Sequence, residues 1–171
     1  MNFNKIFKTG LIALITGSLG YFVYANGSSD DAKADVDLEI VESIEITKDQ
    51  DMNFGQITYS GGGSVELDFS GNLSATGDVE IFDDGNAQAA IFDVSGEDNT
   101  AFSVTFPDGD IDLTGDSHND LITVDNFQED AASELDGSGD ETFNVSANAT
   151  IDGDESVDTY NGEFTVEVSY D

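Results

Sequence analysis

Short stretches in which apolar and polar residues alternate run through most of this chain. The clearest one lies near its end, where polar residues separate the apolar side chains Phe164, Val166, Val168 and Tyr170. Successive side chains of a β-strand point to opposite faces, so this pattern predicts a closing strand with one buried and one solvated face.

A second long apolar face is predicted near the other end of the chain. It consists of Val36, Leu38, Ile40, Ile44 and Ile46, all on even positions, and it is interrupted once by Glu42. We interpret it as the first strand, and as a strand that could pair either with its own sheet or with a neighbouring molecule.

Further strands are predicted between these two. In "DMNFGQITY" the apolar phase changes at Gly55, which indicates a bulge or kink, and the "SGGGS" stretch at residues 60–64 is typical of a turn. The remaining apolar stretches lie at 65–69, 79–81, 91–94, 102–106, 111–113, 121–124 and 143–151, with turn sequences such as "PDGD" and "DGSGD" between them.

The pattern as a whole favours an all-β fold. After residue 25 no apolar repeat of 3.6 residues lasts ten positions, and only residues 128–139 leave open a choice between one helical turn and a long loop. About eight to ten short strands with such turns predict an antiparallel β-sandwich.

The first 25 residues resemble a secretory signal. Lys5 and Lys8 precede an apolar run from Leu11 to Val23, which is short for a membrane span of roughly 20 residues, and Val-Tyr-Ala offers a cleavage site after Ala25. A retained anchor and a cut near Ala34 are the alternatives. We therefore predict a signal peptide (1–25), a flexible acidic leader (26–34) and one β-sandwich domain (35–171), exported to the periplasm, the cell surface or the medium.

The charge of the chain is strongly negative, with 37 Asp and Glu, 4 Lys and Arg, and a net charge of −33 at pH 7. Such a surface repels phosphate backbones and anionic lipids, which argues against binding to nucleic acid or, after signal cleavage, to membranes. Adaptation to salty, halophilic surroundings would explain it, because salt screens repulsion; a fold that depends on divalent cations is the alternative. The chain contains no Cys, so it has no disulfide framework.

Three segments in order resemble the bacterial secreted family called domain of unknown function 4402. They are "LEIVESIEITKDQDMNFGQI", "AIFDVSGEDNTAFSVTFPDGDIDLTG" and the closing "YNGEFTVEVSYD". The resemblance spans most of residues 34–171. It implies an exported, immunoglobulin-like sandwich, distantly similar to spore-coat U and chaperone-usher pilus subunits, and it carries over no catalytic residue.

The best candidate for a metal site is "PDGDIDLTGD". Asp108, Asp110, Asp112 and Asp116 place oxygen ligands at near-alternate positions, as calcium prefers, although Leu113 and Asn119 break the EF-hand pattern. Asp110 and Asp112 could equally form the outward face of a strand whose inward residues are Ile111 and Leu113. Calcium is thus the one cofactor that the sequence suggests.

No catalytic constellation is apparent in the sequence. His118 is the one histidine, stands in the polar stretch "GDSHND", and is expected to be a solvated loop residue without a nucleophile beside it. Carboxylates are so abundant that any pair could be assigned to acid and base roles, so their presence indicates nothing. We expect that the protein is not an enzyme.

These observations together predict an exported structural or adhesive protein. The expected role is a subunit of a pilus-like filament or coat on the cell surface, which pairs β-strands with further copies of itself or with other surface subunits. The alternative is a solitary periplasmic or extracellular binding module, in one form dependent on calcium.

Overall fold

A computed structural model describes residue 27 and residues 29–171, so the predicted signal peptide lies outside the described residues. The chain divides into two units, Met1–Leu38 and Glu39–Asp171, which are considered separately. In the first unit the described residues are exposed and form neither helix nor strand.

The second unit consists of strands and loops, without a helix. Among the residues that the structure describes, none belongs to a helix long and apolar enough to cross a membrane. The strands are β1 (Glu45–Gln50), β2 (Gln56–Leu67), β3 (Leu73–Asp83), β4 (Ala90–Ser95), β5 (Phe102–Thr105), β6 (Ile111–Gly115), β7 (Leu121–Glu129), β8 (Asp140–Ile151), β9 (Tyr160–Asn161) and β10 (Glu167–Tyr170).

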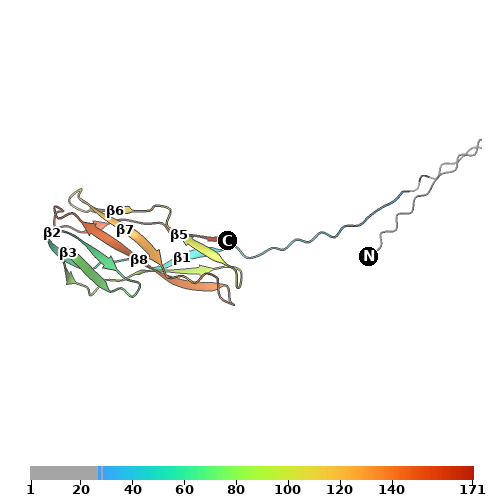
Figure 1. Cartoon of the computed structure of the whole chain (residues 1–171), viewed down its shortest axis with the longest axis horizontal. Coiled ribbons are helices and arrows are strands. Elements are labelled where there is room, and N and C mark those ends of the chain that lie inside the picture. Colours follow the sequence, from blue (N-terminus) through green and yellow to red (C-terminus); the bar gives the residue numbers. More distant parts are fainter. Residues whose placement is uncertain (1–26, 28) are drawn as a thin grey trace, which may run out of the picture. The chain divides into compact units, whose positions relative to one another are not determined.

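Strand β8 organises the fold because it has neighbours on both edges. One edge pairs with β7, while the other pairs with β4 through the first half of β8 and with β2 through the second half. The larger sheet follows the order β1-β4-β8-β7-β6-β9 with β2 and β3 attached, and β10 pairs with β5 in a small second sheet. Figure 1 shows β2 and β3 at one end of this unit, and β1, β5 and the C-terminus at the other.

Two apolar clusters fill the interior. The first joins β2, β3, β7 and β8 through residues such as Val65, Val79, Val124 and Ile151, while the second surrounds Phe143, which is fully buried. In the second cluster the rings of Phe92 and Phe143 stack with their centroids 5.7 Å apart. The all-β antiparallel sandwich predicted from the sequence is confirmed.

The prediction of a first strand over residues 36–46 is wrong for most of that range. Strand β1 begins at Glu45, and Val36, Leu38 and Ile40 are 91%, 86% and 89% exposed. The physical reason lies in the partner strand: β4 ends at Ser95, which pairs with Glu45, so no ladder is left for the residues before it.

The turn predicted at residues 60–64 is also wrong, because β2 runs through the glycines as one strand. Its register against β3 shifts between the pairs Tyr59↔Val79 and Gly63↔Gly77, so the glycines form a bulge and not a turn. A Cβ on Gly63 would lie 2.1 Å from the carbonyl oxygen of Thr76, which explains why glycine is required there.

Residues 128–139, which the sequence left open, form no helix. After β7 the chain continues as a loop, held by an isolated bridge between Ala101 and Glu134. Leu135 anchors this loop in the second cluster and is only 1% exposed. One buried leucine and backbone hydrogen bonds such as Leu135 N–H to the carbonyl oxygen of Thr100 therefore hold a mostly polar loop on the sandwich.

Candidate interaction groove

A groove of about 1210 Å³ opens between the first residues of β2 and strands β6 and β7. One wall is formed by Phe54, Ile57 and Tyr59 at the start of β2, and the facing wall by apolar residues of β6 and β7, among them Ile111 and Leu113. These side chains belong to the first cluster but remain only partly buried. The apolar interior of the sandwich is therefore open to solvent along this side.

The end of β8 at Ile151 explains why this side is open. Strand β2 pairs with β3 from Gln56 onward, but it pairs with β8 only over Gly63–Leu67. Residues 56–60 extend past the end of β8, and within the described residues no strand lies along their second edge. A β-strand edge without a partner offers free N–H and C=O groups.

A loop at residues 152–155 positions Glu155, which is one of the residues that line the groove. The carboxylate of Glu155, which is 8% exposed, accepts hydrogen bonds from the backbone N–H groups of Asp152, Gly153 and Asp154 at 2.6, 2.9 and 3.1 Å. The Tyr59 hydroxyl donates to the carbonyl oxygen of Glu155 and so ties the loop to β2. Although burial raises the pKa of Glu155, these backbone hydrogen bonds outweigh it and lower the pKa, so the carboxylate stays charged.

Asp158 holds the next part of this loop against the turn that contains His118. Its Oδ2 accepts hydrogen bonds from the backbone N–H groups of Ser117 and His118 at 2.6 and 2.9 Å and lies 3.2 Å from His118 Nδ1. Burial raises the pKa of Asp158, but the hydrogen bonds from Ser117, Thr159 and His118 lower it to about 2, against an ordinary value of 3.8. The geometry identifies the pair as a clamp between two loops.

His118 is half exposed in its loop, with 53% of its side chain accessible. Its neighbour Asp158 lies 40 residues away in sequence. Sequence reasoning did not find this partner, because no local spacing connects the two residues. Asp158 is one of the residues that line the groove, whereas His118 is not.

The predicted calcium ligands lie on the opposite, outward surface of β6 and in its flanking loops. Asp112 is exposed on β6 and accepts a hydrogen bond from Thr123 Oγ1 at 3.1 Å, while Ile111 and Leu113 face the core, as the strand interpretation of this segment required. Asp108 accepts from the Thr165 N–H at 2.7 Å and Asp116 from Asn161 Nδ2 at 2.9 Å. Asp110 is exposed just before β6.

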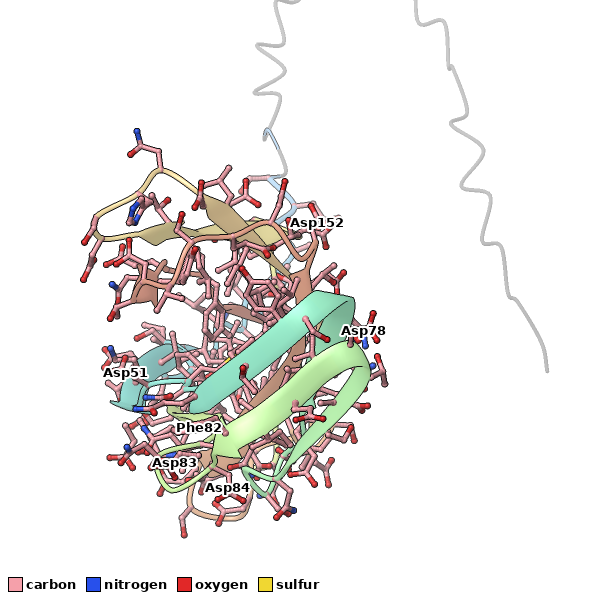
Figure 2. The ribbon with its side chains drawn as sticks, turned by 90° about the vertical axis from the view of Figure 1, so that its left-hand side faces the viewer. Asp51, Asp78, Phe82, Asp83, Asp84 and Asp152 are labelled. Atoms are coloured by element: carbon pink, nitrogen blue, oxygen red, sulfur yellow. The ribbon has the colours of Figure 1, made fainter. Side chains whose placement is uncertain are left out.

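Across the described part of the chain, carboxylates and imidazoles do not come together in groups of three that could hold a metal ion. Figure 2 labels five aspartates at the end of the sandwich formed by β2 and β3: Asp51, Asp78, Asp83, Asp84 and Asp152. Calcium binding by the aspartates of 108–116 stays a prediction.

The closing segment alternates between half-buried and exposed side chains, as the sequence predicted, but only its second half is a strand. Phe164, Val166, Val168 and Tyr170 are half-buried and pack on the second cluster, while the residues between them are exposed. Only Glu167–Tyr170 forms a ladder, with β5. The Tyr170 hydroxyl accepts a hydrogen bond from the Glu97 N–H at 2.7 Å and donates to the carbonyl oxygen of Glu42 at 3.0 Å.

The predicted assembly face is divided by the structure. Ile44 and Ile46 are half-buried and pack on the second cluster, whereas Val36, Leu38 and Ile40 remain exposed. The groove itself was not predicted. The change of apolar phase at Gly55 and the glycine run after Tyr59 are the signals that indicate β2 bends away from the rest of its sheet.

Comparison with known proteins identifies a family for most of the chain. No curated protein and no solved structure matches it, so the distant similarity to spore-coat U and pilus subunits stays an expectation from the sequence. Residues 44–170, which contain all ten strands of the described part, match a family described as a domain of unknown function. The chain therefore belongs to the DUF4402 family.

Proposed function

We propose that this protein is an exported, non-catalytic structural or adhesive subunit of a filament or coat on the cell surface, and that its copies join by pairing of β-strands. The observation that carries the proposal is the exposure of Val36, Leu38 and Ile40. Their alternating pattern is that of a strand with a buried face, yet the described part of the chain does not bury them.

The energetics favour burial of these residues in an assembly. Transferring a Val, Leu or Ile side chain from water to an apolar interior contributes about 1.5 to 3 kcal/mol each, before the entropy of ordering the segment is subtracted. An exposed segment of this kind is a joining element or an aggregation hazard. Acidic residues at positions 35, 37, 39 and 42 keep the segment soluble until it finds a defined partner.

Light scattering after size exclusion, together with negative-stain electron microscopy, tests the proposal on the chain purified after export. We expect polymers or ordered assemblies whose abundance grows with protein concentration and with salt. Intact mass on the same sample checks the predicted cleavage after Ala25. A monomer at every concentration and salt level would contradict the proposal and favour a solitary binding module.

A further inference from the structure

We propose that the groove at the β2 end accepts residues Val36–Val41 of a second copy as an added strand. The incoming segment would lie along residues 56–60 of β2 with Val36, Leu38 and Ile40 directed into the groove. This inference rests on the proposed function. It identifies the acceptor site, the donated segment and the face of that segment that enters the groove.

The size of the groove suits a peptide strand. Its volume of about 1210 Å³ exceeds the roughly 300–1,000 Å³ of pockets for small molecules. Residues 36–41 in extended form span about 20 Å at a rise of roughly 3.3 Å per residue, and residues 56–60 of β2 offer an edge of about 17 Å. The donated segment and the acceptor edge therefore match in length.

The backbone of β2 is prepared for one more strand. Ile57, Thr58 and Tyr59 pair with β3 on one edge, and the ladder with β8 on the other edge begins only at Gly63. Alternate backbone groups of residues 56–60 therefore point toward the groove. A strand added there would satisfy them and would cover the partly buried wall residues Phe54 and Leu113 at the same time.

The side-chain pattern of the donated segment fits this placement. Val36, Leu38 and Ile40 lie on one face of an extended chain and Asp37 and Glu39 on the other. With the apolar face in the groove, both carboxylates remain in solvent. The opposite orientation would bury two charges against apolar walls, so the pattern selects one face.

Ile40 cannot reach the groove of its own molecule, because the chain between Ile40 and the start of β1 is too short. The backbone of Glu42 is tied to Glu97 and Tyr170, and β1 leads from there toward Lys48 and Asp51 at the rim of the groove. Ile40 can lie at most about 7 Å from Glu42, whereas the distance from Glu45 to Gln50 along β1 is already about 17 Å. Ile40 therefore cannot lie in the groove of its own molecule, which favours a second copy as the donor.

Cysteine pairing between copies tests this placement directly, because the chain has no cysteine of its own. Purified Leu38→Cys chains are mixed with Ile57→Cys chains under mild oxidation, so that only contact between molecules can form the mixed disulfide. We expect a cross-linked dimer on a non-reducing gel. Ser74→Cys, on the exposed face of β3, serves as the matched control and is expected to give no such product with Leu38→Cys.

Substitutions in the donated segment supply a second test. Leu38→Asp with Ile40→Asp should leave the melting temperature unchanged, because both residues are exposed, and should abolish assembly. The matched control, Asp37→Asn with Glu39→Gln, changes the opposite face and should assemble at least as well. If Ile57→Cys lowers the melting temperature, Phe54→Cys replaces it in the cross-linking test.

The possible results separate the two proposals. Polymers that persist in the Leu38→Asp, Ile40→Asp variant, or that give no Leu38–Ile57 cross-link, would overturn the groove assignment and leave the strand-pairing function standing. A disulfide within one molecule of a Leu38→Cys, Ile57→Cys double variant at high dilution would overturn the second copy as occupant. The absence of any polymer in the unsubstituted chain would overturn both proposals.

Discussion

At the scale of single residues, several carboxylates of this acidic chain stabilise its own turns. Oδ1 of Asp68 accepts hydrogen bonds from the N–H groups of Ser70 and Asn72, and Oδ1 of Asp136 does the same for Ser138 and Asp140. Hydrogen bonds to the charged form lower the pKa of both groups, led by Asn72 at Asp68 and by Asp140 at Asp136. Part of the negative charge is therefore a structural requirement of the turns.

Asp158 gives a pH prediction at this scale. Its folded-state pKa, about 2, is below the ordinary value of 3.8, so its contribution to stability is complete above about pH 4 and is lost as the pH falls toward 2. We expect Asp158→Asn to melt below the unsubstituted chain at pH 6, and the difference to vanish near pH 2. Thermal melts monitored by circular dichroism across this range, with Asp110→Asn as the control, measure it.

A difference between Asp158→Asn and the unsubstituted chain that stays constant from pH 6 to pH 2 would contradict the role of the charged carboxylate. It would indicate that shape, and not charge, is what Asp158 contributes to the clamp. Asp110→Asn removes one negative charge at an exposed position outside the clamp, so it measures how much of the difference comes from the loss of charge alone.

At the scale of elements, the closing strand and the first strand depend on each other. Strand β10 pairs with β5, and its last residue, Tyr170, reaches across to the backbone of Glu97 and Glu42. The end of the domain thus fixes the point at which the exposed segment leaves the sandwich. This supports a role for the closing strand in completing the protein's own fold.

Tyr170→Phe tests this connection. Removing the hydroxyl deletes two hydrogen bonds and leaves the packing of the ring intact, so we expect a loss of about 1 to 2 kcal/mol in the free energy of unfolding. Backbone amide exchange should speed up at Glu97 and in residues 42–44 but remain slow in β8. Unchanged exchange at Glu97 would show that the hydroxyl does not hold the start of the domain.

At the scale of the whole molecule, repulsion among carboxylates opposes both folding and assembly. The net charge is −33. Within the described residues, the only ion pair made by a lysine is that between Lys48 and Asp51. Exposed pairs of this kind contribute little, so we expect screening by salt to take the place of pairing. The same screening would let one acidic copy approach another.

Salt and calcium can be distinguished by their effect on melting. We expect the melting temperature to rise from low salt to molar NaCl, because a Debye length of roughly 3 Å at 1 M removes most of the repulsion. Millimolar calcium is then compared at matched ionic strength, in the unsubstituted chain and in Asp112→Asn. A flat melting temperature from low to high NaCl would refute the role of screening.

A further rise with calcium that disappears in Asp112→Asn would locate the predicted ion at the aspartates of 108–116. Equal melting temperatures with and without calcium, at matched ionic strength, would instead contradict a calcium site at these aspartates. Either result is informative, because Asp112 already has a structural partner in Thr123.

The sequence by itself determined the local features of this protein. Alternation fixed the strands around Phe143 and Val168, because the two faces of a strand are a property of the backbone, and the Asp and Gly turns followed from side chains that bond to their own backbone. The motifs were also sufficient to indicate the family. The outward position of Asp112 and the inward positions of Ile111 and Leu113 agree with one of the two interpretations that the sequence left open, the strand and not the calcium loop.

Only the tertiary structure decided what depends on a partner distant in the sequence. Val36–Ile40 has a strand pattern but no ladder, because β4 ends at Ser95, and the glycines after Tyr59 bend a strand instead of ending it, because β3 continues beside them. The groove and the Asp158–His118 clamp arise in the same way, from the lengths of neighbouring strands and loops. Alternation gives each residue its face, whereas pairing and burial depend on what the rest of the fold places opposite it.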